Sequence, residues 1–209
     1  MTSPALLVRR TSPAALTGFI GGGLLLGSVV IRVIEQPLPF PFAGTVSLAL
    51  FSAALFVFAF GIRGAGSITA RRPLGTTALA LLAIWLLLGS VLYGVIADSF
   101  SNNPVPNILM AFAYADSFVQ FALALTAVMQ IVRLGAVPAP WNWVPAGVTA
   151  AVTLTWVLLQ LVGSGAPTMV GPNAVTWFLM TLDSLARIGG TMLLGVIAIV
   201  LADRTDRAS

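Results

Sequence analysis

Six long runs of mostly apolar residues follow one another along the chain, separated by short segments in which polar residues are more frequent. A helix needs about 20 mostly apolar residues to cross the hydrocarbon core of a bilayer, because each residue advances it by about 1.5 Å. The pattern therefore predicts an all-α integral membrane protein, a bundle of six transmembrane helices. The predicted spans are 16–35, 44–62, 76–97, 108–132, 144–162 and 176–201.

The arginines indicate which side of the membrane each loop faces. Eight of the ten lie in the N-terminal tail, the second and fourth loops and the C-terminal tail, whereas the first, third and fifth loops have none. Cytoplasmic loops are enriched in basic residues. Both termini are therefore predicted to be cytoplasmic, with the loops around 37–42, 99–106 and 164–171 outside. No loop is long enough to fold alone, so residues 1–209 are predicted to form a single transmembrane domain.

The composition agrees with this class and excludes several chemistries. Of the 209 residues, 58% are hydrophobic and 8% are charged, and the mean hydropathy is +1.02, whereas a soluble domain carries about 25% charged residues. The chain has no cysteine, histidine or lysine, which removes thiolate, imidazole and Schiff-base chemistry and the usual haem, iron–sulfur and zinc-protease ligands. No cofactor or metal is predicted. The basic residues form no clustered face, so nucleic acid is not predicted as a partner.

Short similarities between the spans predict an internal repeat. The sequence Leu-Leu-Leu-Gly-Ser-Val occurs at 24–29 and again at 86–91. A proline lies ten residues before Asp116, eleven before Asp183 and eleven before Ser52. These matches favour three tandem helical hairpins inserted in the same direction. Chance similarity is the alternative, because Leu, Val, Ala and Gly dominate the composition.

Small residues at a spacing of four predict close helix packing. Gly23 and Gly27 have this spacing in the first span, and Thr191 and Gly195 have it in the sixth. Small side chains let two helix backbones approach each other in a membrane. The contacts could form within the chain, in a homo-oligomer or with other membrane proteins.

Five of the polar residues inside two of the spans form a candidate cluster: Asp116, Ser117 and Gln120 in the fourth, and Asp183 and Arg187 in the sixth. Each aspartate lies about ten residues into its span, roughly 15 Å below the outer surface. An ionised side chain at that depth costs about 2.5–3.5 kcal/mol on insertion scales. Asp183 and Arg187 are spaced i, i+4 and can pair along one helix face. Asp116 has only Gln120 at that spacing, so it either reaches Arg187 across a helix interface or is protonated.

Two interpretations of this cluster remain. In the first, these five residues line a polar cavity, open to the outer side, that binds a small solute or relays protons. In the second, they are internal contacts that hold the fourth and sixth helices in register without access to solvent. A pair of aspartates also occurs in intramembrane aspartyl proteases. Here the local sequences Tyr-Ala-Asp and Thr-Leu-Asp lack the Tyr-Asp and Gly-x-Gly-Asp motifs of that class.

A second charged group is predicted near the outer surface. Arg32 and Glu35 share one face of the first span at i, i+3, and Asp98 follows the third span. They could close the outer mouth of the bundle as an ion pair. An ordinary interfacial ion pair, with Arg32 extending toward the headgroups, is the alternative.

These patterns leave the function undetermined between classes. The hypothesis favoured by the mid-membrane carboxylates is a small permease or channel-like protein for a small solute or ion. The alternative is a non-catalytic accessory or structural subunit of a membrane complex, and an enzyme would have to work with Asp and Ser alone. Arginine without lysine and a high alanine content favour a bacterial plasma membrane. Apart from the lipid bilayer, no partner and no substrate can be named.

Overall fold

The computed structural model describes residues 12–35, 42–62, 67, 72–99, 107–135, 141–165 and 174–208. Six helices that are long and apolar enough to cross a membrane account for nearly all of these residues, which confirms the predicted class. A short 3₁₀ helix, η1 (Trp141–Trp143), precedes the fifth. The six are α1 (Pro13–Glu35), α2 (Ala43–Phe60), α3 (Pro73–Ser99), α4 (Asn107–Leu134), α5 (Val144–Gly165) and α6 (Ala174–Ala208).

The helix ends differ from the predicted spans by a few residues, because hydropathy marks the membrane and not the ends of the helices. α1 begins at Pro13, where the Ser12 hydroxyl accepts a hydrogen bond of 3.2 Å from the Ala15 N–H and so caps the helix. α2 ends at Phe60 because Gly61 adopts a φ of 68°, which is open to glycine. α6 continues beyond the predicted end into a polar segment.

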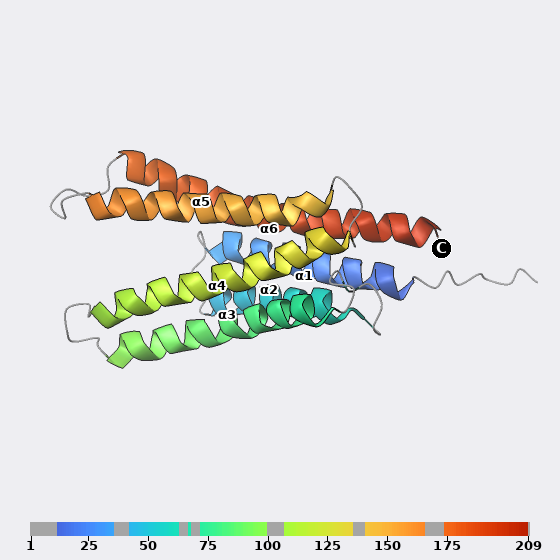
Figure 1. The fold of residues 1–209 in the computed structure, drawn as a ribbon, viewed down its shortest axis with the longest axis horizontal. Helices are drawn as coiled ribbons and strands as arrows, with labels where there is room; N and C mark the ends of the chain where they lie inside the picture. Colours follow the sequence, from blue (N-terminus) through green and yellow to red (C-terminus); the bar gives the residue numbers. More distant parts are fainter. Residues whose placement is uncertain are drawn as a thin grey trace, which may run out of the picture.

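The helices pack as three antiparallel hairpins, α1–α2, α3–α4 and α5–α6. Figure 1 shows the second and third hairpins on either side of α1 and α2. Each helix contacts the next one in the sequence, and α6 also packs along α1. The six helices are therefore arranged as a closed ring in the order of the sequence. The contact between α4 and α5 is the smallest in this order. The hairpins agree with the predicted arrangement, and their origin by duplication stays a prediction.

Glycines let the backbones of α1 and α6 approach each other closely. A Cβ on Gly22 would lie 2.7 Å from the carbonyl oxygen of Gly195, and a Cβ on Gly18 would lie 2.9 Å from that of Ala198. Gly195 was predicted to pack closely, and this is confirmed. Gly23 makes no such contact with the described residues, because none of their atoms lies within 4 Å of its Cβ position, and its packing against another copy or another protein stays a prediction. One residue along a helix is a rotation of about 100°, which turns Gly23 away from α6.

Hydroxyl groups tie the first hairpin together near both ends. At one end the buried Thr17 hydroxyl accepts a hydrogen bond of 2.8 Å from the backbone N–H of Ile62. At the other end the buried Ser47 hydroxyl donates to the carbonyl oxygen of Ser28 at 2.8 Å. Such bonds hold membrane helices together where the hydrophobic effect between them is lost.

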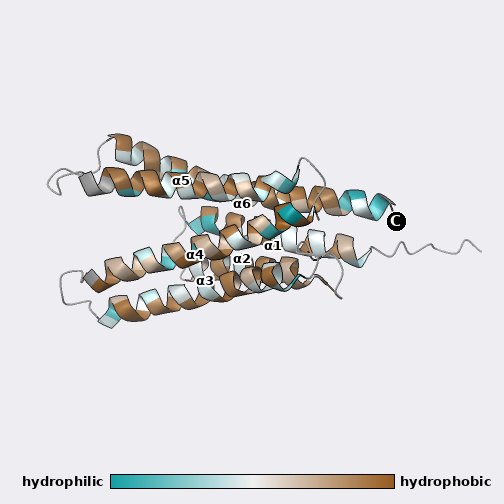
Figure 2. Cartoon of the chain, in the orientation of Figure 1, coloured by the Kyte–Doolittle hydropathy of each residue, from teal (hydrophilic) through white to brown (hydrophobic). Residues whose placement is uncertain are grey.

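Four of the six described arginines gather at one end of the bundle and indicate its sidedness. Arg72, Arg133, Arg204 and Arg207 lie at the end where α3 begins and where α4 and α6 finish. Figure 2 shows hydrophilic residues at the C-terminal end of α6 and mostly hydrophobic residues along the other helices. By the positive-inside rule this end is cytoplasmic. Arg9, Arg10, Arg63, Arg71 and most of each predicted outer loop lie outside the described residues.

Two adjacent glycines in α1 test the α1–α6 contact. Gly22→Ala would place a methyl group against the Gly195 backbone, so we expect the free energy of unfolding to fall by about 1–3 kcal/mol. Gly23→Ala should be neutral or stabilising by up to about 1 kcal/mol, because alanine favours the helix and meets no neighbour. The measurement is denaturant unfolding in detergent micelles followed by circular dichroism. Equal effects of the two substitutions would contradict the contact.

Candidate functional site

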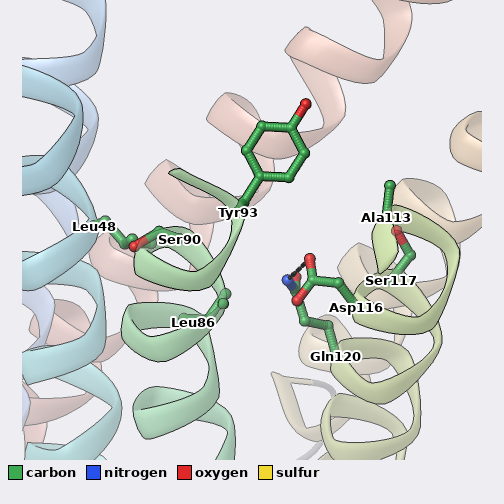
Figure 3. Close-up of a pocket in the computed structure, with 9 residues that line it drawn as sticks. Leu48, Leu86, Ser90, Tyr93, Ala113, Asp116, Ser117 and Gln120 are labelled. Atoms are coloured by element: carbon green, nitrogen blue, oxygen red, sulfur yellow. Dashed lines mark hydrogen bonds between the residues drawn. The ribbon is translucent and has the colours of Figure 1, made fainter. Parts of the chain in front are cut away.

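A pocket of about 400 Å³ lies between α3 and α4. Each of these helices contributes four residues at i, i+3, i+4 and i+7, which is one continuous face of a helix. Figure 3 shows the labelled residues on the two facing helices, with Leu48 of α2 beside them. The lining residues are Leu48, Leu86, Gly89, Ser90, Tyr93, Ala113, Asp116, Ser117 and Gln120.

Asp116 provides the only carboxyl group among the described residues that line this pocket, and both of its carboxyl oxygens accept hydrogen bonds from neutral donors. The indole N–H of Trp85 donates to Oδ1 at 2.8 Å, across the α3–α4 interface. The side-chain amide of Gln120 donates to Oδ2 at 2.8 Å, from one turn along α4 (Figure 3). Among the described residues, no arginine lies within ion-pair distance of Asp116.

Gly89 makes room for the carboxylate. A Cβ at this position would lie 2.8 Å from Oδ1 of Asp116 and 3.9 Å from the indole nitrogen of Trp85. Any larger residue would therefore push the Asp116 side chain away from α3. Gly89 lies within the repeated Leu-Leu-Leu-Gly-Ser-Val sequence, which is the signal that could have marked it as a site residue.

Asp183 lies in a separate cluster between α5 and α6. Arg187 donates from Nε to its Oδ2 at 2.7 Å, which confirms the pair predicted from their i, i+4 spacing. The buried Thr155 hydroxyl of α5 is placed to donate to Oδ1 at 2.9 Å. The side chain of Asp183 is 17% exposed and that of Arg187 is 41% exposed. This carboxylate is therefore compensated by a positive charge in its own helix.

The structure does not bring the predicted cluster of five residues into one cavity. Asp116, Ser117 and Gln120 line the α3–α4 pocket, whereas Asp183 and Arg187 lie outside it. Each polar cluster joins the two helices of one hairpin, and α4 and α6 share no substantial contact among the described residues. The predicted contact between Asp116 and Arg187 is therefore not seen. Nor do these polar residues hold α4 and α6 in register with each other.

One partner of Asp116, Trp85, and one further pocket residue, Tyr93, were missed in the sequence. Trp85 and Tyr93 are aromatic residues in an apolar span, where they are indistinguishable from lipid-facing residues by type alone. Their role depends on the rotation of α3 against α4, which the sequence pattern does not determine.

The predicted outer group of Arg32, Glu35 and Asp98 is not joined by any hydrogen bond or ion pair in the part of the chain that the structure describes. Arg32 and Glu35 lie in the last turn of α1, and Asp98 lies at the end of α3. Arg32 and Asp98 are exposed. The carboxylate of Glu35 lies instead beside Gly44 at the start of α2, 3.4 Å from that residue's Cβ position.

The two aspartates have equivalent surroundings in successive hairpins. Each accepts one hydrogen bond from the preceding helix, from Trp85 or Thr155, and one from the residue four positions later. The difference is that the residue at i+4 is neutral in α4 and cationic in α6. In the first hairpin the equivalent residue, Ser52, is buried and its hydroxyl has no hydrogen-bond partner.

Within the described residues, no group of three or more His, Cys, Asp or Glu side chains is placed to hold a metal ion. Comparisons with protein-family models, with curated proteins and with solved structures find no match to this chain. The function is therefore inferred from the geometry of the chain itself.

Two glycines of α3 test the position of Asp116. Gly89→Ala should displace the carboxylate and break its bond to Trp85, at a cost of roughly 1–2 kcal/mol in the free energy of unfolding. Gly94→Ala is the matched control, because no atom lies within 4 Å of that Cβ position. The readout is the indole N–H resonance of Trp85 in tryptophan-labelled protein, assigned by Trp85→Phe. An unmoved resonance in Gly89→Ala would refute the contact.

The α6 ion pair makes a separate prediction about coupled charges. Arg187→Gln or Asp183→Asn alone leaves one charge without its partner, so each should lower the free energy of unfolding by about 1–3 kcal/mol. The double variant should cost at least about 1 kcal/mol less than the sum of the two. Unfolding of all four proteins in detergent measures this coupling, and strict additivity would show that the pair does not interact.

Proposed function

We propose that this chain is a small permease or channel-like protein for a small solute or ion, with the α3–α4 pocket around Asp116 as its polar site at mid-membrane. The observation that carries the proposal is a carboxylate that faces a pocket of about 400 Å³ and has no cationic partner among the described residues. Asp116 lies about ten residues into α4, roughly 15 Å from the outer end of the helix.

The contrast with Asp183 supports a functional role for Asp116. An ionised group at mid-membrane costs about 2.5–3.5 kcal/mol, and Arg187 offsets part of this cost for Asp183. Nothing comparable offsets it for Asp116. An asparagine could accept the bond from Trp85 and pair with Gln120 without carrying a charge. A purely structural contact between α3 and α4 therefore does not require a carboxylate, whereas binding of a polar or cationic solute gains from one.

The loosest helix contact is a candidate for movement during transport. α4 and α5 share little contact. The rings of Tyr114 and Trp156 pack edge to face between them, with their centroids 6.5 Å apart. A permease must open its site to each side in turn, which requires two arrangements of its helices. Separation of the second and third hairpins along this seam would disturb the fewest contacts.

An accessory subunit is the second candidate, and one observation favours it. Gly23 is exposed and has no atom of the described residues within 4 Å of its Cβ position, although Gly22 beside it is used for packing. A glycine on an outer face of a membrane helix allows another helix to approach closely. Under this hypothesis the pocket needs no access to water.

Access of water to the pocket separates the two candidates. Because the chain has no cysteine, Ser90→Cys and Ser117→Cys each introduce a single thiol at the pocket, and the change in size is small. A thiol reacts as the thiolate, which requires water. We expect a membrane-impermeant maleimide to label both positions in intact cells. Phe118→Cys is the control, because Phe118 follows Ser117 on α4 and is 71% exposed on the outer surface of the bundle.

Labelling at 90 and 117 but not at 118 would support the permease hypothesis. No labelling at either pocket position, in protein shown to be inserted and folded, would overturn it and favour the accessory subunit. Labelling at all three positions would show that the thiols are reached without a defined aqueous route, which also contradicts the proposal. Disruption of the membrane with detergent should expose all three thiols and serves as the positive control.

A further inference from the structure

We propose that the α3–α4 pocket binds a monovalent organic ammonium, an inference that rests on the proposed function and names the class of its solute. The first argument is charge. Asp116 is the one ionisable carboxylate among the nine lining residues, and no arginine lines the pocket. Its deprotonated form therefore gives the pocket a charge of about −1, which one positive charge neutralises.

The carboxylate keeps free acceptor positions for such a ligand. Each carboxylate oxygen can accept about two hydrogen bonds. Oδ1 already accepts one from Trp85 and Oδ2 one from Gln120. Both donors are neutral, so they orient the carboxylate without neutralising it. Each oxygen can therefore accept one more hydrogen bond from the N–H group of an ammonium ligand. A quaternary ammonium has no N–H group and would instead be attracted by the negative charge of the carboxylate.

The rest of the lining suits an ammonium with an apolar body. Leu48, Leu86 and Ala113 supply aliphatic surface, and Ser90 and Ser117 supply small hydroxyl groups. In Figure 3 the Tyr93 side chain stands at the edge of the pocket, on the same face of α3 as Ser90. An aromatic face attracts a cation through its quadrupole, and quaternary ammonium groups are commonly bound in this way.

The size of the pocket and its ligand atoms favour an organic cation over a metal ion. A volume of about 400 Å³ falls in the range of small-molecule sites, about 300–1,000 Å³, and greatly exceeds the volume of a bare ion. Divalent metals such as calcium are bound by about six to eight oxygen atoms, including several carboxylates. The pocket offers one carboxylate with both oxygens already in hydrogen bonds.

The probe is radiolabelled benzyltrimethylammonium, bound at equilibrium to the full chain in phosphatidylglycerol nanodiscs. Choline and 3,3-dimethylbutan-1-ol have the same shape and differ in the charge at one atom, so they serve as matched competitors. We expect choline to displace the probe at a concentration at least tenfold lower than the alcohol does. Equal displacement by the two compounds would overturn the proposal, because the pocket would then recognise shape without charge.

Substitutions locate the binding. Asp116→Asn should weaken probe binding at least tenfold, and Ala113→Leu should weaken it similarly by filling the pocket while the charge is retained. Asp203→Asn makes the same chemical change at the exposed cytoplasmic end of α6 and should leave the affinity within about twofold. Because Ala113 is exposed, its variant tests the site even where Asp116→Asn does not fold. Wild-type affinity in both pocket variants would refute the site.

The source of the ammonium is tested in the same assay. If phosphatidylethanolamine added to the nanodiscs competes with the probe, the ligand is a lipid headgroup. If the added lipid does not compete, the ligand is a soluble ammonium. If the thiols at 90 and 117 are labelled but no ammonium binds, the ammonium proposal is refuted, and the permease proposal still holds for another solute. Ammonium binding without labelling would show a binding site with no aqueous route, and would remove the permease proposal instead.

Discussion

Hydrocarbon offers no hydrogen bonds, so a polar group inside the bilayer must find its partner within the protein. This constraint decides how each hairpin is held together. Hydroxyl groups at Thr17 and Ser47 join α1 to α2, and aspartates join the helices of the other two hairpins. Small residues contribute to one of the contacts between hairpins, where Gly22 and Gly195 let α1 and α6 meet along their backbones.

The same constraint explains why two similar carboxylates are assigned different roles. Both accept a hydrogen bond from the preceding helix and another from the residue at i+4. In α6 that residue is Arg187, and the cluster is a compensated structural contact. In α4 it is Gln120, which is neutral, so the carboxyl group beside the pocket has no cationic partner among the described residues. A single difference at i+4 thus separates an ion pair within α6 from the site that we propose binds a cation.

Interactions between near neighbours in sequence could be predicted, and those between helices could not. The Asp183–Arg187 pair and the Gln120–Asp116 bond follow from the geometry of one helix, where residues four apart lie on one face. The bond from Trp85 to Asp116 joins residues 31 positions apart. The choice of Gly22 over Gly23 as the packing residue depends on a rotation of α1 that no local pattern indicates.

By itself the sequence determined the number of spans, their approximate limits, the cytoplasmic side and the absence of thiol, imidazole and lysine chemistry. These properties depend on composition and on length along the chain, which the bilayer thickness converts directly into structure. Only the tertiary structure decided which faces meet, that the clusters of Asp116 and Asp183 stay apart, and that one of them borders a pocket. The physical reason is that these helices are apolar on nearly every side. In lipid no contrast between a buried and an exposed face marks their orientation, so it is set by shape and by a few polar contacts.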